Sequence, residues 1–524
     1  MLRWPLKFLE KTGPSEQGQA PSAMKERITF VHAPGADIDP KLIEVQDAGL
    51  LGPPVITTRE DRLTIPVDEL PAEIAETLLQ VASLHVKWAS PIAYDSVDPF
   101  SSRVSPGLHI SYSSLPDEPN DPKRLCALLR DAFGALKCDS IETFTSSETS
   151  SSTKTPPTHY MYHELDNLND LVSHLSSTYC QEMDPVCQSR SRSLYTAASL
   201  DIAYDAAAKV AKVTAFWPLM EQSIAVPSST QRRTEVGIMG MDAPPNMQPH
   251  ELGVSGLLTV LLEQQKPSPV LFGFPARHRS TDAVFSAEFL SPTGLHPSLQ
   301  LRLSSNQPPA TESTCKPHAY LTLPKSIFAD RYQLADELFL ASKNLSSSPY
   351  TSLPVDLEAP AYTTQVWGSN VLLELAPPST GGSPTAWTAE IPLHLRYLEP
   401  SQSGLREVNV PYPAVFWACA PGTDADFGSS PFDRVNLGYD GLFEPGTTFW
   451  HVNPRPVSGD RIVSSVTVPV LSEDASQWVG IGTSVAIALG FAWVLWKCMR
   501  GYEEHGAGDG RQRPEIKKTP VPRM

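Results

Sequence analysis

The sequence predicts a mainly β protein, with an α+β N-terminal region, an all-β sandwich-like domain and one C-terminal transmembrane helix. Three observations predict it. The chain contains 51 prolines, which favour short strands and turns because proline disrupts helix interiors and central strands. Short alternating apolar and polar runs recur between Pro, Gly and Ser clusters. Finally, residues 478–496 are apolar and carry no charge.

Residues 24–284 form the predicted α+β region, preceded by residues 1–23 as a disordered extension or an upstream start. Met24 opens the strand-like run MKERITFVH, so translation from Met1 or from Met24 stays open. Helical apolar spacing predicts helices over residues 71–86, 122–136 and 167–179. Alternation predicts strands over residues 26–34, 62–70, 107–115, 199–205, 208–218, 256–265 and 269–277, the last two as a hairpin.

Residues 285–470 form the predicted all-β domain, because helical spacing nearly disappears there. Short alternating runs separated by turn residues are typical of a compact sandwich. The expected strands cover residues 295–304, 318–324, 369–377, 389–399, 406–419 and 461–470.

The C-terminal segment WVGIGTSVAIALGFAWVLW has the length of a membrane span. At about 1.5 Å per residue, a helix of this length just crosses the roughly 30 Å hydrocarbon core of a bilayer. We expect a linker over residues 471–477, a transmembrane helix over 478–496 and a tail over 497–524.

The charges beside the span predict its orientation. Lys497 and Arg500 follow it and Glu473 and Asp474 precede it, and basic residues tend to stay on the cytoplasmic side. We expect a lumenal N-terminal domain, inserted by the span itself because the N-terminus MLRWPLKFLEK lacks the apolar run of a signal peptide. The alternative is a tail-anchored protein with a cytosolic domain.

Charge and cysteine content narrow the possible partners and the compartment of this protein. A net charge of -17 argues against nucleic acid as a partner, since its phosphates require Lys and Arg clusters. An even number of cysteines before the span suits disulfides in an oxidising lumen, with buried free thiols as the alternative. These are Cys126, Cys138, Cys180, Cys187, Cys315 and Cys419, whose pairing the spacing leaves open; Cys498 follows the span as a free thiol.

No catalytic motif is present: HExxH, GxSxG, Walker A and GxGxxG runs are all missing. Two Asp-x-Asp triplets, at Asp37 and Asp39 and at Asp424 and Asp426, leave a metal-dependent glycosyltransferase as an alternative. Both lie in turn-rich sequence where acidic pairs are usually solvated, so we expect no metal and no cofactor. Three histidines at strand positions are expected to be structural: His296, His318 and His394.

Two further features bear on the membrane setting. Asn344, in Asn-Leu-Ser, is a glycosylation sequon, which has meaning only in the lumen and would mark an exposed loop. Gly482, Ala486 and Gly490 recur every four residues in the span, and such small residues let a second membrane helix approach closely.

The second half of the chain resembles the PIG-X family over roughly residues 285–470. The resemblance lies in motifs that follow the family's order: TGLHPSLQLRL (293–303), CKPHAYL (315–321), LPKSIFADRYQLADE (323–337), VDLEAPAY (355–362), IPLHLRYLEP (391–400) and YPAVFWAC (412–419). The N-terminal half is similar to the longer fungal members. The Pro/Gly/Ser-rich stretch 377–388 departs from the pattern.

The resemblance implies a non-catalytic subunit of the endoplasmic reticulum (ER) mannosyltransferase that adds the first mannose to the glycosylphosphatidylinositol (GPI) anchor precursor. The catalytic partner would be a multi-span PIG-M-like subunit that this chain stabilises. Fungal members also support the folding of other lumenal proteins. The family's cysteines further imply a bridge between Cys315 and Cys419, worth about 4 to 5 kcal/mol by chain entropy.

Two alternatives stay open beside this subunit: a general lumenal chaperone, and an enzyme using Asp424 and Asp426. Phe416, Trp417, Tyr439 and Phe443 are candidate partner contacts, with core packing as the competing explanation. The stoichiometry and the binding role of the N-terminal region are not determined by the sequence.

Overall fold

A computed structural model describes residues 24–33, 35–36, 38–115, 121–146, 157–180, 184–248, 250–309, 314–352, 356–378, 384–420 and 425–506. The chain divides into two compact units, one of Met1–Tyr397 with Val408–Val466, the other of Leu398–Glu407 with Thr467–Met524. Both β regions expected from the sequence fall mainly in the first unit. The boundary between them, at residues 284 and 285, stays a prediction.

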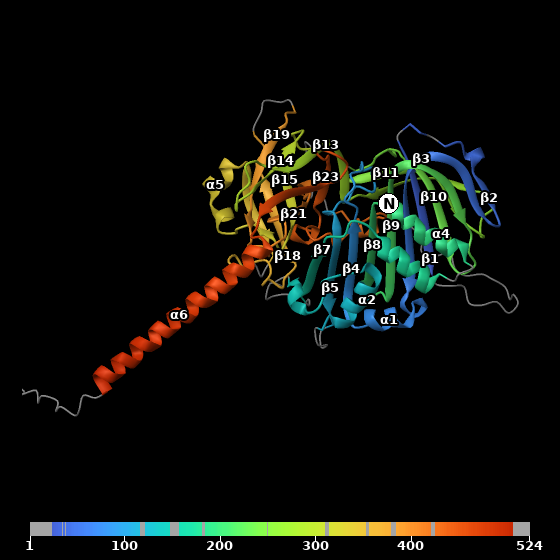
Figure 1. Ribbon diagram of the computed structural model, residues 1–524. Helices are drawn as coiled ribbons and strands as arrows, with labels where there is room; N and C mark the ends of the chain where they lie inside the picture. Colours follow the sequence, from blue (N-terminus) through green and yellow to red (C-terminus); the bar gives the residue numbers. More distant parts are fainter. Residues whose placement is uncertain are drawn as a thin grey trace, which may run out of the picture. The chain divides into compact units, whose positions relative to one another are not determined.

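The N-terminal half builds one 12-stranded sheet with the order β12-β11-β10-β1-β3-β9-β8-β4-β5-β7-β6, to which β2 is added beside β3 (Figure 1). Its ladders are antiparallel except for β1 and β10, which pair in parallel. The strands are β1 (Lys25–His32), β2 (Glu44–Gln46), β3 (Gly49–Pro66), β4 (Val81–Ala89), β5 (Gly107–Ser114), β6 (Thr145–Ser146), β7 (Thr158–His163), β8 (Ser199–Asp205), β9 (Val210–Pro227), β10 (Arg233–Met241), β11 (Glu251–Val260) and β12 (Ser268–Pro275).

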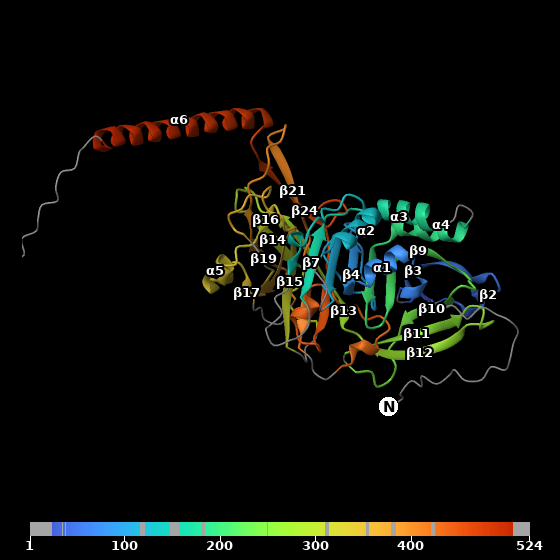
Figure 2. The ribbon, with the colours of Figure 1, turned by 90° about the horizontal axis from the view of Figure 1, so that it is seen from below.

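Short helices cover one face of this sheet (Figure 2). They are α1 (Ala72–Leu78), α2 (Lys123–Phe133), α3 (Asn169–His174), which continues as a π-helical turn, and α4 (Pro185–Ser193). The prediction of one helix over residues 71–86 is wrong in its second half. There the alternation of the buried residues Leu84, Val86 and Trp88 makes a strand, because a period of two turns all three toward the helices.

The C-terminal half builds an 8-stranded sheet with the order β17-β18-β15-β22-β23-β13-β14-β19. The strands are β13 (His278–Phe289), β14 (Ser298–Leu303), β15 (Cys315–Pro324), β17 (Leu345–Thr351), β18 (Gly368–Leu375), β19 (Trp387–Pro392), β22 (Ala414–Cys419) and β23 (Thr448–Pro454). Helix α5 (Glu337–Ser342) precedes β17. Smaller pairs join β16 (Ile327–Phe328) to β20 (His394–Leu395), and β21 (Leu405–Pro411) to β24 (Val463–Pro469).

This second sheet curls until its two edge strands meet. The backbone N–H of Glu390, in β19, donates to the carbonyl of Lys343, 3.0 Å away between α5 and β17. The side chains of the same two residues form an ion pair at 2.6 Å. Alternate residues, such as Leu299 and Leu301, are fully buried inside the curl. The sandwich-like β domain is therefore one hydrogen-bonded sheet folded over its own core.

The loop between β22 and β23 fastens the second sheet to the first. Its described part, residues 425–447, places Phe432 in an apolar cluster with Phe100, Phe216 and Phe274 of the N-terminal half. Tyr439 of the same loop is fully buried, and its hydroxyl donates to the carbonyl of Arg103 at 2.9 Å. We call residues 425–447 the inserted loop.

Candidate functional site

Helix α6 (Glu473–Gly506) dominates the second unit and contains the predicted span. At about 1.5 Å per residue, its 34 residues extend about 51 Å. Among the described residues, it alone is long and apolar enough to cross a membrane, and its apolar window is not buried by any other part of the protein. Side chains such as Ile487, Leu489 and Phe491 are about two-thirds exposed. This helix fits a single-pass membrane protein.

The segment expected as a linker, residues 471–477, mostly forms the first turn of α6. The Ser472 hydroxyl accepts a hydrogen bond from the N–H of Ala475 at 3.3 Å, as an N-cap residue does. The N–H of Glu473 donates to the carbonyl of Ser401, also at 3.3 Å, so the short segment around Ser401 satisfies a second free donor. Glu473 and Asp474 then place negative charge at the positive end of the helix dipole.

The other end of the apolar stretch carries cations against an aromatic ring. Lys497 and Arg500 lie 5.4 and 5.2 Å from the centre of the Trp496 ring. Long basic side chains and tryptophan both favour the membrane–water interface. The charge asymmetry that underlies the predicted orientation is therefore present at both ends of the apolar stretch, and the orientation itself stays a prediction.

The small-residue stripe expected from the sequence lies on an open face of α6. Gly482, Ala486 and Gly490 are all exposed. A Cβ atom added at Gly482 or at Gly490 would meet nothing within 4 Å. A second helix therefore has room to approach the backbone here, which is the geometry that small residues favour in lipid.

All six cysteines before the span are paired. The disulfides join Cys126 to Cys138, Cys180 to Cys187, and Cys315 to Cys419. The third is the bridge that the resemblance implied: its cysteines lie opposite each other on β15 and β22, with Cα atoms 4.0 Å apart and 104 positions apart in the sequence. Cys498 is free and exposed.

Asn344 of the sequon lies in a more confined place than an exposed loop. It is half-buried between α5 and β17, with a φ of +56°, a backbone conformation that asparagine tolerates well after a helix. Its side-chain amide donates to the carbonyl of Thr388 in β19 at 2.8 Å. This residue thus has a structural role in closing the curled sheet, and its glycosylation stays a prediction.

The Asp-x-Asp triplets lie only partly within the described residues, because Asp37 and Asp424 fall outside them. The Asp39 carboxylate accepts from the N–H of Lys41 at 3.0 Å and so caps a short helical turn. Asp426 precedes another such turn. Within the described part of the chain, no group of three or more His, Cys, Asp or Glu residues is placed to hold a metal ion.

The histidines and aromatic residues singled out in the sequence are mostly interior. Phe416, Trp417 and Tyr439 are almost completely buried, so core packing explains them. His318 is 4% exposed, and its Nδ1 lies 2.9 Å from the carbonyl of Lys316. The two remaining histidines, His296 and His394, contact each other through their Nδ1 atoms at 2.9 Å.

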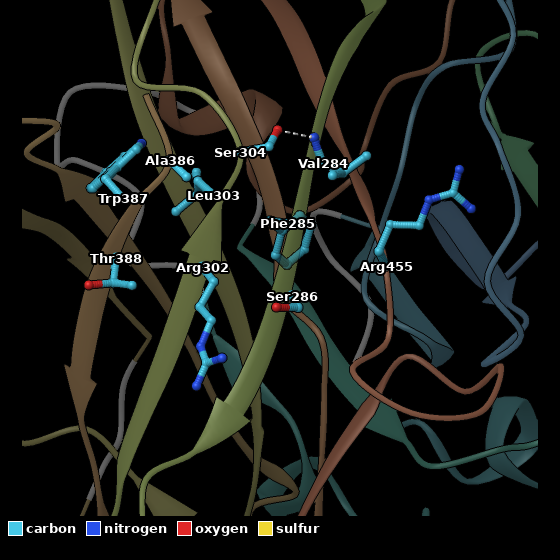
Figure 3. A pocket seen from close by; sticks show the side chains of 10 residues that line it. All are labelled: Val284, Phe285, Ser286, Arg302, Leu303, Ser304, Ala386, Trp387, Thr388 and Arg455. Atoms are coloured by element: carbon cyan, nitrogen blue, oxygen red, sulfur yellow. Dashed lines mark hydrogen bonds between the residues drawn. The ribbon is translucent and has the colours of Figure 1, made fainter. Parts of the chain in front are cut away.

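One pocket, of about 360 Å³, lies over β13, β14 and β19 (Figure 3). Arg302 and Arg455 lie on opposite sides of the Phe285 ring, and both are engaged elsewhere. Arg302 is 3.6 Å from Glu288 and Arg455 is 2.7 Å from Asp95. The hollow is therefore an open depression between surface ion pairs.

A set of paired charges lies where the inserted loop meets the first sheet. Glu60 is 2% exposed and forms ion pairs with Arg62 and with Arg434 of the loop. Lys87 pairs with Asp201. Burial would raise the pKa of Asp201, but the positive charges of Lys87 and Arg434 outweigh burial and lower it. The pair of Glu60 and Arg434 holds the loop in place. No local sequence signal marks this pair or that of Lys87 and Asp201, because the partners lie 374 and 114 positions apart in the sequence.

Comparison with known proteins places the chain in a family. Residues 292–499 match the family model described as PIG-X / PBN1. Protein PBN1 of Gibberella zeae is 52% identical over 475 residues, covering 90% of this chain and 95% of that protein. Protein pbn1 of Neurospora crassa is 45% identical with the same coverage, and Protein PBN1 of Yarrowia lipolytica is 28% identical over 84% of this chain and 90% of that protein.

The fold and the helix define a class: a mainly β protein with three disulfides and, among the residues that the structure describes, one helix that fits a membrane span. Within that class, the chain belongs to the PIG-X/PBN1 family. A solved structure, the Fcho1 Mu homology domain of Danio rerio with a bound Eps15 peptide, reaches a TM-score of only 0.14 at 11% identity, over 86% of this chain and 97% of that one.

Proposed function

We propose that this protein is a non-catalytic, stabilising subunit of the ER mannosyltransferase that adds the first mannose to the GPI-anchor precursor. It would be a single-pass protein with a lumenal β domain and a cytosolic tail. Its main partner would be the multi-span catalytic subunit, which is PIG-M-like, and it would also support the folding of some lumenal client proteins.

The observation that carries this proposal is membership of the PIG-X/PBN1 family, reached through similarity over 90% of the chain. The family match extends to residue 499 and so includes the apolar part of α6. A multi-span enzyme offers helices to this exposed face, and an oxidising lumen favours the three disulfides. The alternatives are a general lumenal chaperone and a glycosyltransferase that uses Asp424 and Asp426.

Replacing the two glycines of the small-residue stripe with larger residues tests whether a membrane partner docks there. The full-length protein carrying Gly482→Ile and Gly490→Ile is expected to lose most of the co-purifying mannosyltransferase, because two branched side chains would hold a neighbouring helix away. The measurement is affinity purification from gently solubilised membranes, with the partner quantified by mass spectrometry.

Gly480→Ile provides the matched control. Gly480 is equally open, with nothing within 4 Å of an added Cβ, but it lies outside the repeat of Gly482, Ala486 and Gly490 and on a neighbouring stripe of small residues. Equal recovery of the partner with the double variant and with this control would contradict docking through the stripe. Recovery of many unrelated lumenal proteins without a mannosyltransferase would favour the chaperone.

Substitution of the second Asp-x-Asp triplet tests the alternative that this protein is an enzyme. Asp424→Ala combined with Asp426→Ala should leave GPI-anchor synthesis at the wild-type level in cells that express normal amounts of the protein. Loss of synthesis at that expression level would favour a catalytic role for these carboxylates.

A further inference from the structure

Four exposed side chains, three tyrosines and a leucine, lie around the small sheet of β16 and β20 in the first unit. Tyr397 is 68% exposed, Tyr332 64%, Tyr362 55% and Leu295 51%. We call these four side chains the tyrosine patch. Single exposed apolar side chains are normal, but a group of them marks an interaction site for a protein or a membrane.

Hydrogen bonds bring together the segments that carry the patch. The N–H of Leu395, in β20, donates to the carbonyl of Leu295 at 2.9 Å. Just after β20, the carbonyl of Tyr397 accepts from the N–H of Ala361 at 3.0 Å. Ala361 directly precedes Tyr362. Three members of the patch are therefore attached to β20 or to the residues that follow it.

The fourth member, Tyr332, joins the same surface through its neighbours. Gln333 Oε1 lies 3.0 Å from Nε2 of His394, in β20. The Cζ atom of Arg331 lies 4.9 Å from the centre of the Tyr332 ring, and its guanidinium donates to the Tyr332 hydroxyl at 2.9 Å. The Asp330 carboxylate accepts from the N–H of Tyr332 at 2.8 Å. One positive and one negative side chain thus flank Tyr332, so the charges beside it balance.

The inner side of this small sheet is packed against the core. Ile327 and Phe328 of β16 are almost completely buried, and so is Leu334. The Cζ atom of Arg396 lies 4.5 Å from the centre of the Phe328 ring, and its guanidinium donates to the carbonyl of Ala359 at 2.8 Å. Because the core lies on this side, the tyrosine patch projects into solvent from a firmly packed support.

The chain leads directly from the patch to the membrane helix. The stretch from Tyr397 to Ser401 spans at most about 14 Å when fully extended. The Ser401 carbonyl accepts from the N–H of Glu473, in the first turn of α6, at 3.3 Å. Trp478, where the apolar stretch begins, follows about 7.5 Å further along the helix. Chain connection alone therefore keeps Tyr397 within about 30 Å of the start of the apolar stretch.

We propose that the tyrosine patch rests on the surface of the bilayer that α6 crosses, and that its partner is the head-group region of zwitterionic phospholipids. Tyrosine favours the membrane–water interface because its ring enters the apolar boundary while its hydroxyl stays hydrated. Leu295 adds a purely apolar side chain. The balanced charges around Tyr332 give no preference for anionic lipids, which attract clusters of Lys and Arg. The proposal rests on α6 as a span and not on the proposed function.

The depth of a spin label tests this contact in the full-length protein. Cys498→Ser removes the free thiol, and Tyr362→Cys then carries a nitroxide. The protein is placed in phosphatidylcholine nanodiscs, whose two faces are both open to solvent. Power-saturation EPR compares collisions with oxygen, which concentrates in lipid, and with a nickel chelate, which stays in water. We expect the label about 5 to 10 Å into the boundary between head groups and acyl chains, the depth of other interfacial side chains.

Leu271→Cys is the matched control for the label. Leu271 is also 55% exposed, but it lies on β12 at the edge of the first sheet. A label there should collide with the nickel chelate as freely as a label in water. Thermal unfolding checks that each variant is folded, and Tyr397→Cys provides a second patch label if Tyr362→Cys is not. Adding Tyr332→Ser and Tyr397→Ser to Tyr362→Cys should raise its nickel accessibility toward that of the control.

Four outcomes would overturn the proposal. The labels at positions 362 and 271 could be equally accessible to the nickel chelate, so that the patch lies in water. The patch label could be shielded from both reagents, which would indicate a protein contact such as a second copy of this chain. Lipid contact could require added anionic lipid, which is not the proposed partner. Finally, the two added serines could leave the depth unchanged, in which case the tyrosines do not make the contact.

Discussion

At the scale of single residues, this protein contains buried or half-buried histidines whose pKa is lowered by burial. His85 and His109 each have a pKa lowered to about 4 and His278 to about 3, in every case first because of burial. His451 is lowered as well and contacts His278, with Nε2 and Nδ1 3.0 Å apart. These side chains make the folded state sensitive to acid.

Acid lowers the stability of the folded state because the unfolded chain takes up more protons. Below a pH of about 6.5, the unfolded chain binds a proton at each of these histidines and the folded chain does not, so stability falls as the pH falls toward the folded pKa. For His109 alone, the loss between pH 7.5 and 5.5 is about 1.4 kcal/mol. His109→Gln should remove that part of the pH dependence of the free energy of unfolding, measured by denaturant titration at both pH values.

A surface histidine gives the control for this measurement. His296 is exposed, and His296→Gln should preserve the wild-type difference between the two pH values. An unchanged pH dependence in His109→Gln would contradict a neutral, buried His109.

At the scale of elements, the inserted loop is the main connection between the sheets. Phe432 packs edge-on against Phe100, with ring centres 5.5 Å apart, and lies 5.0 Å from Phe274. Glu60 and Arg434 add a buried ion pair beside it. The loop therefore combines an apolar anchor with a charged one, and both attach to strands of the N-terminal half.

Removing the apolar anchor should be costly. Phe432→Ala is expected to lower the free energy of unfolding by about 3 to 5 kcal/mol, because a buried ring leaves a cavity in a packed cluster. Denaturant unfolding of the full-length protein in micelles measures the change. Val435→Ala, at a 43% exposed position of the same loop, should change it by about 0.5 kcal/mol or less. Similar effects of the two variants would mean that Phe432 does not anchor the loop.

At the scale of the whole molecule, compartment and orientation are linked through the disulfides. Three disulfides precede α6 and the free Cys498 follows the apolar stretch. Disulfides persist in oxidising compartments, and the cations after the span favour the cytoplasmic side. Both observations favour the proposed arrangement of a lumenal β domain and a cytosolic tail.

Protease protection in sealed microsomes tests that arrangement. A tag after Met524 should be digested without detergent, while a fragment containing the β domain should survive until detergent is added. Endoglycosidase treatment of the protected fragment then reports on Asn344, with Asn344→Gln as the control. Digestion of the β domain in intact microsomes would instead indicate the tail-anchored orientation.

The sequence by itself determined the features that depend on neighbouring residues. The uncharged run of α6 predicts a membrane span because the hydropathies of successive residues add along a helix. Alternation located many of the strands, including the paired β8 and β9 and the hairpin of β11 and β12, and helical spacing located α2. The family motifs also pointed to the bridge between Cys315 and Cys419 without any geometry.

Only the tertiary structure decided which distant segments meet. The parallel pairing of β1 with β10, the curl that places Asn344 beside Thr388, the other two disulfides and the docking of the inserted loop all join residues by packing. A strand's own pattern says which face is buried but not which strand lies beside it, because many pairings satisfy the same alternation. The choice among them rests on how both halves of the chain fill a shared core.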